Sequence, residues 1–125
     1  LNPPLLLDAT EVGWSCEHND QNFILLVNLI HLISEAEATT IIREISIALA
    51  PGGRAIIYGP FKKDGKLTSA GDISFHRSLK EADTEIGYKD DKWMIDQFSE
   101  RILKLIKIQD MPANNLAFII ERPLV

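Results

Sequence analysis

Two apolar runs on either side of a helix pattern constrain the fold more than any other feature of this sequence. "FILLVNLI" (residues 23–30) and "RAIIY" (residues 54–58) are almost continuously apolar, which is typical of strands covered on both faces. Between them, Ser34 followed three residues later by Glu37 is a capping-box signature, and apolar residues then recur at helical spacing. "PGG" (residues 51–53) is expected to end that helix. Strand, helix and strand in this order predict a parallel pair joined by a right-handed crossover.

The rest of the chain predicts two further helices and a terminal hairpin. One helix is expected to be capped by Asp72, and a longer one to start near Asp91. Four apolar residues of the longer helix share a face by their spacing: Met94, Phe98, Ile102 and Leu105. Residues 106–110 alternate as in an edge strand, whereas "LAFIIE" (residues 116–121) is continuous as in an interior strand. The short turn between them predicts antiparallel pairing, with the second strand further inside the sheet.

The start of the chain predicts one more strand. In "PLLLD" (residues 4–8) an apolar run ends at Asp8, as in a short buried strand that reaches a polar site. The backbone of a buried strand needs neighbours for its N–H and C=O groups. The sequence before it offers no such neighbour, so we expect this strand to pair elsewhere or with another chain.

Composition excludes several classes of function. The 125 residues predict a single domain over residues 1–125, and the net charge of −5 argues against binding to nucleic acid. The lone Cys16 excludes an internal disulfide, and the three histidines have no metal-ligand spacing, so no metal site is expected. No apolar run reaches the roughly 20 residues that a membrane span needs. We therefore expect a cytoplasmic protein that does not bind membranes.

Five short motifs carry a family resemblance. They are "NLIH" (28–31), "LAPGG" (49–53), "YGPF" (58–61), "TS" (68–69) and "MPANNL" (111–116). In this order they resemble the class I S-adenosylmethionine (SAM)-dependent methyltransferase-like family, formerly a domain of unknown function, that includes methyltransferase-like protein 26. The resemblance implies an α/β fold. It would be a truncated Rossmann-like methyltransferase sheet, with parallel strands, a C-terminal antiparallel hairpin and helices on both faces.

The sequence departs from this family where the cofactor is held. Members usually carry a Gly-rich loop after the first strand and an acidic residue after the second, and neither is present here. We therefore expect a partial methyltransferase-like domain that does not bind SAM tightly by itself and is a non-catalytic, self-associating remnant. The alternative is a small-molecule methyltransferase whose missing N-terminal half is supplied elsewhere.

The resemblance and the strand ends together select candidate cofactor residues. In open α/β sheets, ligands bind beyond the carboxyl ends of the strands. Asp8, Asn28 and His31 lie at or near such ends and are candidates for contacts with SAM. His31 is also the candidate catalytic base, although it could instead cap the loop after the strand by bonding to backbone. Asn28, an amide in an apolar strand, could equally brace a neighbouring loop.

Two further motifs are candidates for binding a small-molecule substrate. Their residues are Tyr58, Gly59, Pro60 and Phe61 in the first, and Asn114 and Asn115 in the second. The aromatic residues could form the wall of a pocket, but core packing is their commoner role. The two asparagines could position a substrate through their amides or could simply shape the turn, because Asn tolerates left-handed conformations.

The strand at residues 23–30 also predicts a partner. If the usual neighbour of this strand is missing, one edge presents unpaired N–H and C=O groups on a hydrophobic strand, which is a template for pairing with another chain. Two-fold dimers are the commonest closed assembly. We therefore expect a homodimer joined along residues 23–30.

Overall fold

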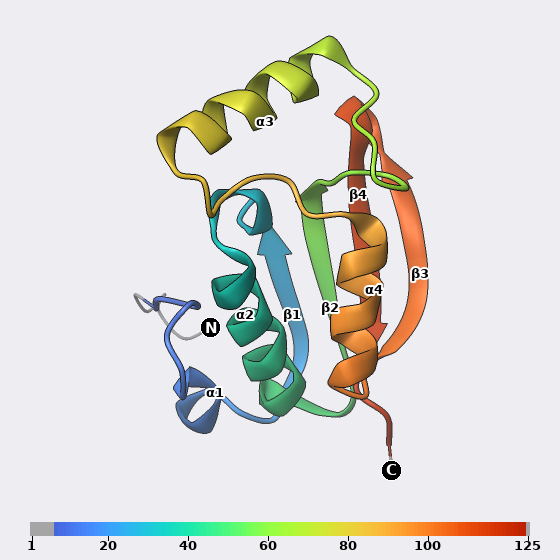
Figure 1. The fold of residues 1–125 in the computed structure, drawn as a ribbon. Coiled ribbons are helices and arrows are strands. Elements are labelled where there is room, and N and C mark those ends of the chain that lie inside the picture. Colours follow the sequence, from blue (N-terminus) through green and yellow to red (C-terminus); the bar gives the residue numbers. More distant parts are fainter. Residues whose placement is uncertain (1–6, 125) are drawn as a thin grey trace.

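The computed structural model describes residues 7–124 and contains a four-stranded sheet with the order β1-β2-β4-β3 (Figure 1). β1 (Gln21–Val27) pairs in parallel with β2 (Leu49–Pro60). β4 (Asn115–Glu121) lies antiparallel to β2, and β3 (Lys104–Met111) forms the outer strand of the terminal hairpin. The predicted mixed α/β class, the parallel pair and the inner position of the last strand are confirmed.

The helix between the parallel strands begins where predicted, but it ends directly at a strand rather than at a turn. α2 (Glu35–Ala48) has a complete capping box, in which the Ser34 side chain accepts from the backbone N–H of Glu37 and the Glu37 carboxylate accepts from that of Ser34. Leu49 then already belongs to β2, so "PGG" lies inside the strand rather than in a turn before it. The backbone of Gly52 and Gly53 pairs with Arg122 beyond β4, at 2.7 and 2.9 Å. A Cβ atom at Gly53 would lie 2.7 Å from the carbonyl oxygen of Gln21, which explains why a glycine suits this position.

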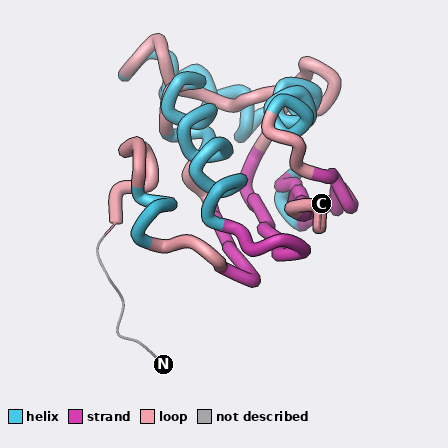
Figure 2. Tube along the Cα trace, turned by 90° about the horizontal axis from the view of Figure 1, so that it is seen from below, coloured by secondary structure: helices cyan, strands magenta, loops and turns pink. Residues whose placement is uncertain are grey.

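α2 and α4 (Asp91–Glu100) cover one face of the sheet. Figure 2 shows both helices on the same side of the strands. Their buried side chains form a single core with alternate residues of the strands, including Ile41, Ile45, Ala55, Ile57, Met94, Phe98, Phe118 and Ile120. Edge-to-face contacts join Phe118 to Phe61 at 4.9 Å and to Phe98 at 5.6 Å between ring centroids. This face therefore holds the hydrophobic core.

The opposite face of the sheet differs from the expectation of helices on both faces. Among residues 7–124, no helix packs against it. The strand register also places Phe23, Arg54, Lys107 and Glu121 on this side of the sheet. A groove on it is lined by residues of all four strands: Leu25, Val27, Ile56, Tyr58, Gln109, Met111, Ala117 and Ile119. We call this surface the bare face. Leu25 and Val27 are 56% and 49% exposed, although their neighbour Leu26 packs against the core. The class of fold is as predicted, but the described residues supply one helical layer rather than two.

The two later helices also differ in their bounds. α3 (Ala70–Ala82) is capped by Ser69, whose hydroxyl accepts from the N–H of Asp72, so Asp72 is the third helical residue and not the cap. α4 is capped by Asp90 and ends at Glu100. Ile102, predicted on its buried face, lies outside the helix with φ of 56° and is 77% exposed. Helical spacing continued past the true end because the following strand is also apolar.

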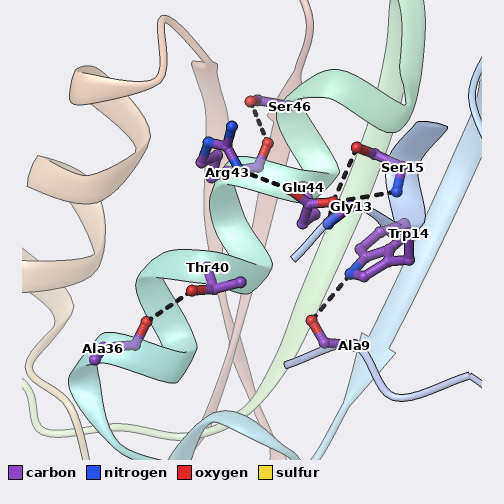
Figure 3. A network of polar contacts seen from close by, with 9 residues as sticks. All are labelled: Ala9, Gly13, Trp14, Ser15, Ala36, Thr40, Arg43, Glu44 and Ser46. Carbon is purple, nitrogen blue, oxygen red and sulfur yellow. Dashed lines mark hydrogen bonds and ion pairs between the residues drawn. The ribbon is translucent and has the colours of Figure 1, made fainter. Parts of the chain in front are cut away.

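A buried acid ties the short helix α1 (Trp14–Glu17) to α2 (Figure 3). Glu44 Oε1 accepts from the N–H of Gly13 at 2.7 Å and from the N–H and hydroxyl of Ser15 at 3.2 and 3.0 Å. Arg43 Nη1 lies 3.0 Å from Glu44 Oε2. Burial alone would raise the pKa of Glu44, but these hydrogen bonds and the Arg43 charge lower it instead. The segment before β1 is thereby fixed against the helical layer.

Candidate functional site

The carboxyl ends of β1 and β2 lie side by side, with Val27 opposite Tyr58. Asn28 follows β1 directly and takes a left-handed conformation, with φ of 56°. Its N–H donates to the Tyr58 carbonyl at 2.8 Å, and its Oδ1 lies 3.6 Å from the position of a Cβ atom at Gly59. Asn28 is exposed and turns the chain, so its prediction as an amide within a buried strand was wrong.

The hairpin turn brings the second substrate motif to the same edge. Pro60 pairs with Asn115 in the sheet register. Asn115 Nδ2 donates to the Tyr58 hydroxyl at 3.1 Å and to the Pro112 carbonyl at 3.1 Å. Tyr58, Gly59, Pro60 and Asn115 are therefore adjacent at one edge of the sheet. The amide of Asn115 also shapes the turn, so the two readings of this residue are not exclusive.

Asp72 connects this edge to α3, which lies beyond the ends of the parallel strands (Figure 1). Its carboxylate accepts from the Tyr88 hydroxyl at 2.7 Å, the Ser69 hydroxyl at 2.7 Å and Asn114 Nδ2 at 3.5 Å. Burial alone would raise the pKa of Asp72, but these three hydrogen bonds lower it. Burial, followed by the hydrogen bond to Asp72, raises the pKa of Tyr88 above its ordinary range. Sequence reasoning missed Tyr88, although Ser69 and Asp72 at capping-box spacing offered a signal for the start of the helix.

His31 is buried beneath α3. It lies in the 3₁₀ turn Ile30–Leu32, and its ring meets the rings of Phe75 and Tyr88 edge-on, both at 5.8 Å. Nδ1 has no hydrogen-bond partner among residues 7–124, whereas the backbone carbonyl of His31 accepts from the N–H of Gly87 at 3.1 Å. Burial, and then the positive charge of Lys89, lower the pKa of His31 and favour its neutral form. The ring could accept a proton, but it does not cap the loop through backbone hydrogen bonds.

Phe61 does not form the wall of a surface pocket. It is 4% exposed and packs in the core against Phe118 at 4.9 Å. Its assignment to a substrate site was therefore wrong, and the commoner reading as a core aromatic holds. Position and residue type did not distinguish the two, because an aromatic residue after a strand suits either role.

A buried lysine next to α3 was also missed. Lys89 is 6% exposed, and its Nζ donates to the carbonyl oxygens of Ile33 and, at 2.8 Å, Gly87. Burial lowers the pKa of Lys89 to about 8. It lines a polar cavity of about 200 Å³ with both acidic and basic side chains around it: Glu35, Lys62, Lys80, Glu85 and Asp90. "KDDKW" reads as an exposed charged segment, and only the tertiary contacts reveal the burial.

Asp8 stands apart from the other two cofactor candidates. Residues 1–6, which include most of the predicted strand, lie outside the described part, and Leu7 and Asp8 are not in a strand. Asp8 Oδ1 accepts from the N–H and hydroxyl of Thr10 at 2.9 and 2.6 Å, and these bonds lower the pKa of Asp8. It is exposed, Asn28 turns the chain and His31 is enclosed by aromatic rings. None of these three residues lines the polar cavity next to α3 or the groove on the bare face.

The described residues therefore do not fit SAM as a set. The Asp8 carboxylate bonds to its own turn, the Asn28 amide is exposed in a turn, and the His31 ring is enclosed by aromatic rings. Together they do not form a site that could hold the methionine and ribose parts of the cofactor. Within residues 7–124, no group of three or more potential ligand side chains could hold a metal ion. None of the helices in this range has the length and apolar character to cross a bilayer.

A family model described as "Protein of unknown function (DUF938)" matches residues 1–122. The chain belongs to this family. Solved methyltransferase structures share its fold. An O-methyltransferase family protein from Burkholderia thailandensis is 18% identical with a TM-score of 0.74, and the match covers 96% of this chain and 34% of that one. The predicted resemblance to a methyltransferase-like family is confirmed.

Two other solved structures agree on the fold. Human N-acetylserotonin methyltransferase, solved in complex with SAM, has a TM-score of 0.76 at 10% identity, and the match covers 93% of this chain and 32% of that one. An O-methyltransferase family 2 protein from Planctomyces limnophilus, solved with apigenin, has a TM-score of 0.70 at 17% identity and coverages of 80% and 30%. This chain thus spans about a third of the length of the structures it matches. At these identities the likeness concerns the fold alone.

Proposed function

We propose that this chain is a methyltransferase-like interaction module, which associates with itself and does not bind SAM tightly on its own. The observation that carries the proposal is the combination of a methyltransferase-like sheet with a bare apolar face and no cofactor cradle among residues 7–124. A SAM site needs backbone donors and a carboxylate for the ribose, and the described edge supplies neither as a set. The apolar face is, by contrast, a surface that favours protein contacts.

Titration calorimetry with SAM tests the absence of tight binding. The full chain at about 50 μM should give no saturable heat, because a dissociation constant of 1 μM would require about −8.2 kcal/mol of binding free energy from a site that lacks these contacts. S-adenosylhomocysteine serves as a second titrant, since it lacks the methyl group and charge but keeps the ribose. Saturation by either ligand at micromolar concentration would refute this part of the proposal.

A second candidate is a small-molecule methyltransferase whose cofactor contacts come from another polypeptide. The edge residues favour it, because Tyr58, Asn114 and Asn115 present polar groups beyond the ends of the parallel strands. In that case His31, whose lowered pKa favours the neutral form and whose Nδ1 has no hydrogen-bond partner among residues 7–124, is the candidate proton acceptor. The SAM titration, repeated with a candidate partner polypeptide added, separates the two functions. Restored SAM affinity supports the enzyme, and an unchanged lack of affinity supports the interaction module.

A further inference from the structure

The polar cavity next to α3 contains a lysine that is buried without a counter-ion. The segment between α3 and α4 runs past the beginnings of α2 and α4 (Figure 1), and it carries Lys89 into the lining of the cavity. Lys89 is 6% exposed, and its Nζ has no carboxylate within 4.0 Å among residues 7–124. Two of its three N–H donors bond to the carbonyl oxygens of Ile33 and Gly87. Because lysines are seldom buried without an opposite charge, this ammonium favours a bound anion.

Three lysines and three acidic residues line the same cavity without pairing with one another. They are Lys62, Lys80, Lys89, Glu35, Glu85 and Asp90. The ion pairs found among residues 7–124 all involve other side chains. Opposite charges in the lining therefore lie more than 4.0 Å apart, across or along the cavity. A ligand that carries both signs could pair with both.

The two signs reach the cavity from different elements. Burial lowers the pKa of His76 in α3, and the charges of Lys62, Lys80 and Lys89 lower it further, with no acidic side chain opposing them. Burial lowers the pKa of Lys89 to about 8, and the largest effect of any charge on it is the opposing one of Glu35. The lysines therefore gather on the side of α3, whereas Glu35 approaches Lys89 from the first turn of α2.

Volume and charge together favour a small zwitterion as the ligand. The cavity of about 200 Å³ is smaller than the roughly 300–1,000 Å³ of pockets for drug-sized ligands. A ligand with only a negative charge would pair with Lys89 but would be repelled by Glu35, and a ligand with only a positive charge would meet the reverse. A free α-amino acid carries a carboxylate and an ammonium on one carbon and has no net charge, so it avoids both repulsions.

We propose that this cavity binds a free α-amino acid with a small side chain, with its carboxylate on Lys89 and its ammonium on Glu35. The carboxylate supplies the counter-ion that the buried lysine lacks among residues 7–124. Glu35 is exposed at the rim, so the ammonium end of the ligand faces the opening. The site is independent of the proposed function, because it uses neither the bare face nor a contact with SAM.

An NMR titration of the ¹⁵N-labelled full chain with L-alanine tests the proposal. Propionate and ethylamine are the matched controls, since each keeps the carbon skeleton of alanine around one of its two charged groups. Alanine should shift the backbone amide signals of Gly87 and Lys89 saturably, with a dissociation constant on the order of 1–10 mM. Propionate and ethylamine should each bind at least about 10-fold more weakly, because each leaves one sign of the cavity unpaired.

Two lysine variants assign the site. Lys89→Met keeps most of the side-chain stem and removes the ammonium, so the affinity for alanine should fall at least about 10-fold. Lys92→Met makes the same substitution at an exposed lysine that pairs with Asp64 outside the cavity, and the affinity should not change. Circular dichroism checks that both variants are folded. If Lys89→Met is not, Glu35→Gln replaces it and should weaken the binding of alanine but not that of propionate.

Three results would overturn the proposal. The first is the absence of saturable shifts with alanine up to about 50 mM, which would show that the cavity has no useful affinity for an amino acid. The second is propionate that binds as tightly as alanine, which would make the cavity a site for anions alone. The third is alanine binding that a folded Lys89→Met or Glu35→Gln variant leaves unchanged, which would place the ligand elsewhere. None of these results bears on the SAM titration, so the proposed function is tested separately.

Discussion

The two faces of the sheet are built by alternate residues of the same strands, yet they have opposite environments. On the helical face, Ile57 and Phe118 are fully buried beneath α2 and α4. On the bare face, Leu25 and Val27 are about half exposed, and the groove that they line is open. The lining of the groove is nonetheless mostly apolar, like the helical face. Apolar side chains in a strand therefore do not reveal which face of the sheet is buried. The structure shows that the described residues bury only the helical face.

The largest expected loss of stability comes from a substitution on the helical face. Phe118→Ala removes a ring that contacts both Phe61 and Phe98 and has no exposed surface. We expect the free energy of unfolding to fall by about 3–5 kcal/mol, because the rigid surroundings leave a cavity. Urea denaturation at a fixed protein concentration measures the loss. A loss of stability below about 1 kcal/mol would mean that the neighbouring side chains move in to fill the space left by the ring, so that the core is not rigidly packed.

A smaller effect is expected where the N-terminal segment is attached to the helical layer. Glu44→Gln keeps the shape of the side chain but removes the negative charge of the carboxylate, whose Oε1 accepts three hydrogen bonds. Near neutral pH the variant should lose about 1.5–3 kcal/mol of stability. The pKa of Glu44 is lowered in the folded state, so its contribution is present above the ordinary value of 4.5 and is lost as the pH falls through the folded value.

Denaturation of wild type and variant across the acid range tests the sign of this effect. The difference between the two should be constant above about pH 6 and should shrink as the pH falls below 4.5. Arg43→Gln is the control: the Arg43 side chain is 44% exposed and supplies only one of the contacts of Glu44, so its removal should cost less. A difference that grows toward acid pH would show that Glu44 is held protonated in the folded protein.

The sequence predicted the elements that rest on local signals. The capping box at Ser34 and the apolar runs of β1, β2 and β4 gave the strand–helix–strand unit and the inner position of the last strand. Boundaries were less accurate where two elements share a property. Leu49 continues the apolar pattern of α2 into β2, and Ile102 continues that of α4 toward β3. Periodicity does not separate a helix end from an apolar strand that follows within a few residues.

The two substrate motifs were selected separately, and the structure joins Tyr58 and Asn115 at one edge by a hydrogen bond. Their role in binding a substrate remains a prediction. The strand position of Asn28 and the substrate-site assignment of Phe61 were mistaken, because both depend on where the strand ends and on what packs against it. Lys89 and Tyr88 were missed because their burial comes from contacts with α3 and the His31 turn, which are distant in sequence.

The smallest expected effect is on the bare face itself, and it sharpens the comparison within a single strand. Leu25→Thr and Leu26→Thr change the same residue type at neighbouring positions of β1, and Thr suits a strand at either. At protein concentrations low enough for a monomer, Leu25→Thr should change the free energy of unfolding by no more than about 0.5 kcal/mol, as is usual for exposed positions. Leu26→Thr should cost about 1–3 kcal/mol, because Leu26 packs against the core.

Thermal unfolding measured at several protein concentrations then separates the faces. If the bare face is buried between two copies, the penalty of Leu25→Thr rises with concentration, whereas that of Leu26→Thr stays constant. Equal penalties at every concentration would mean that the two faces are equally covered, and the distinction between them would be lost.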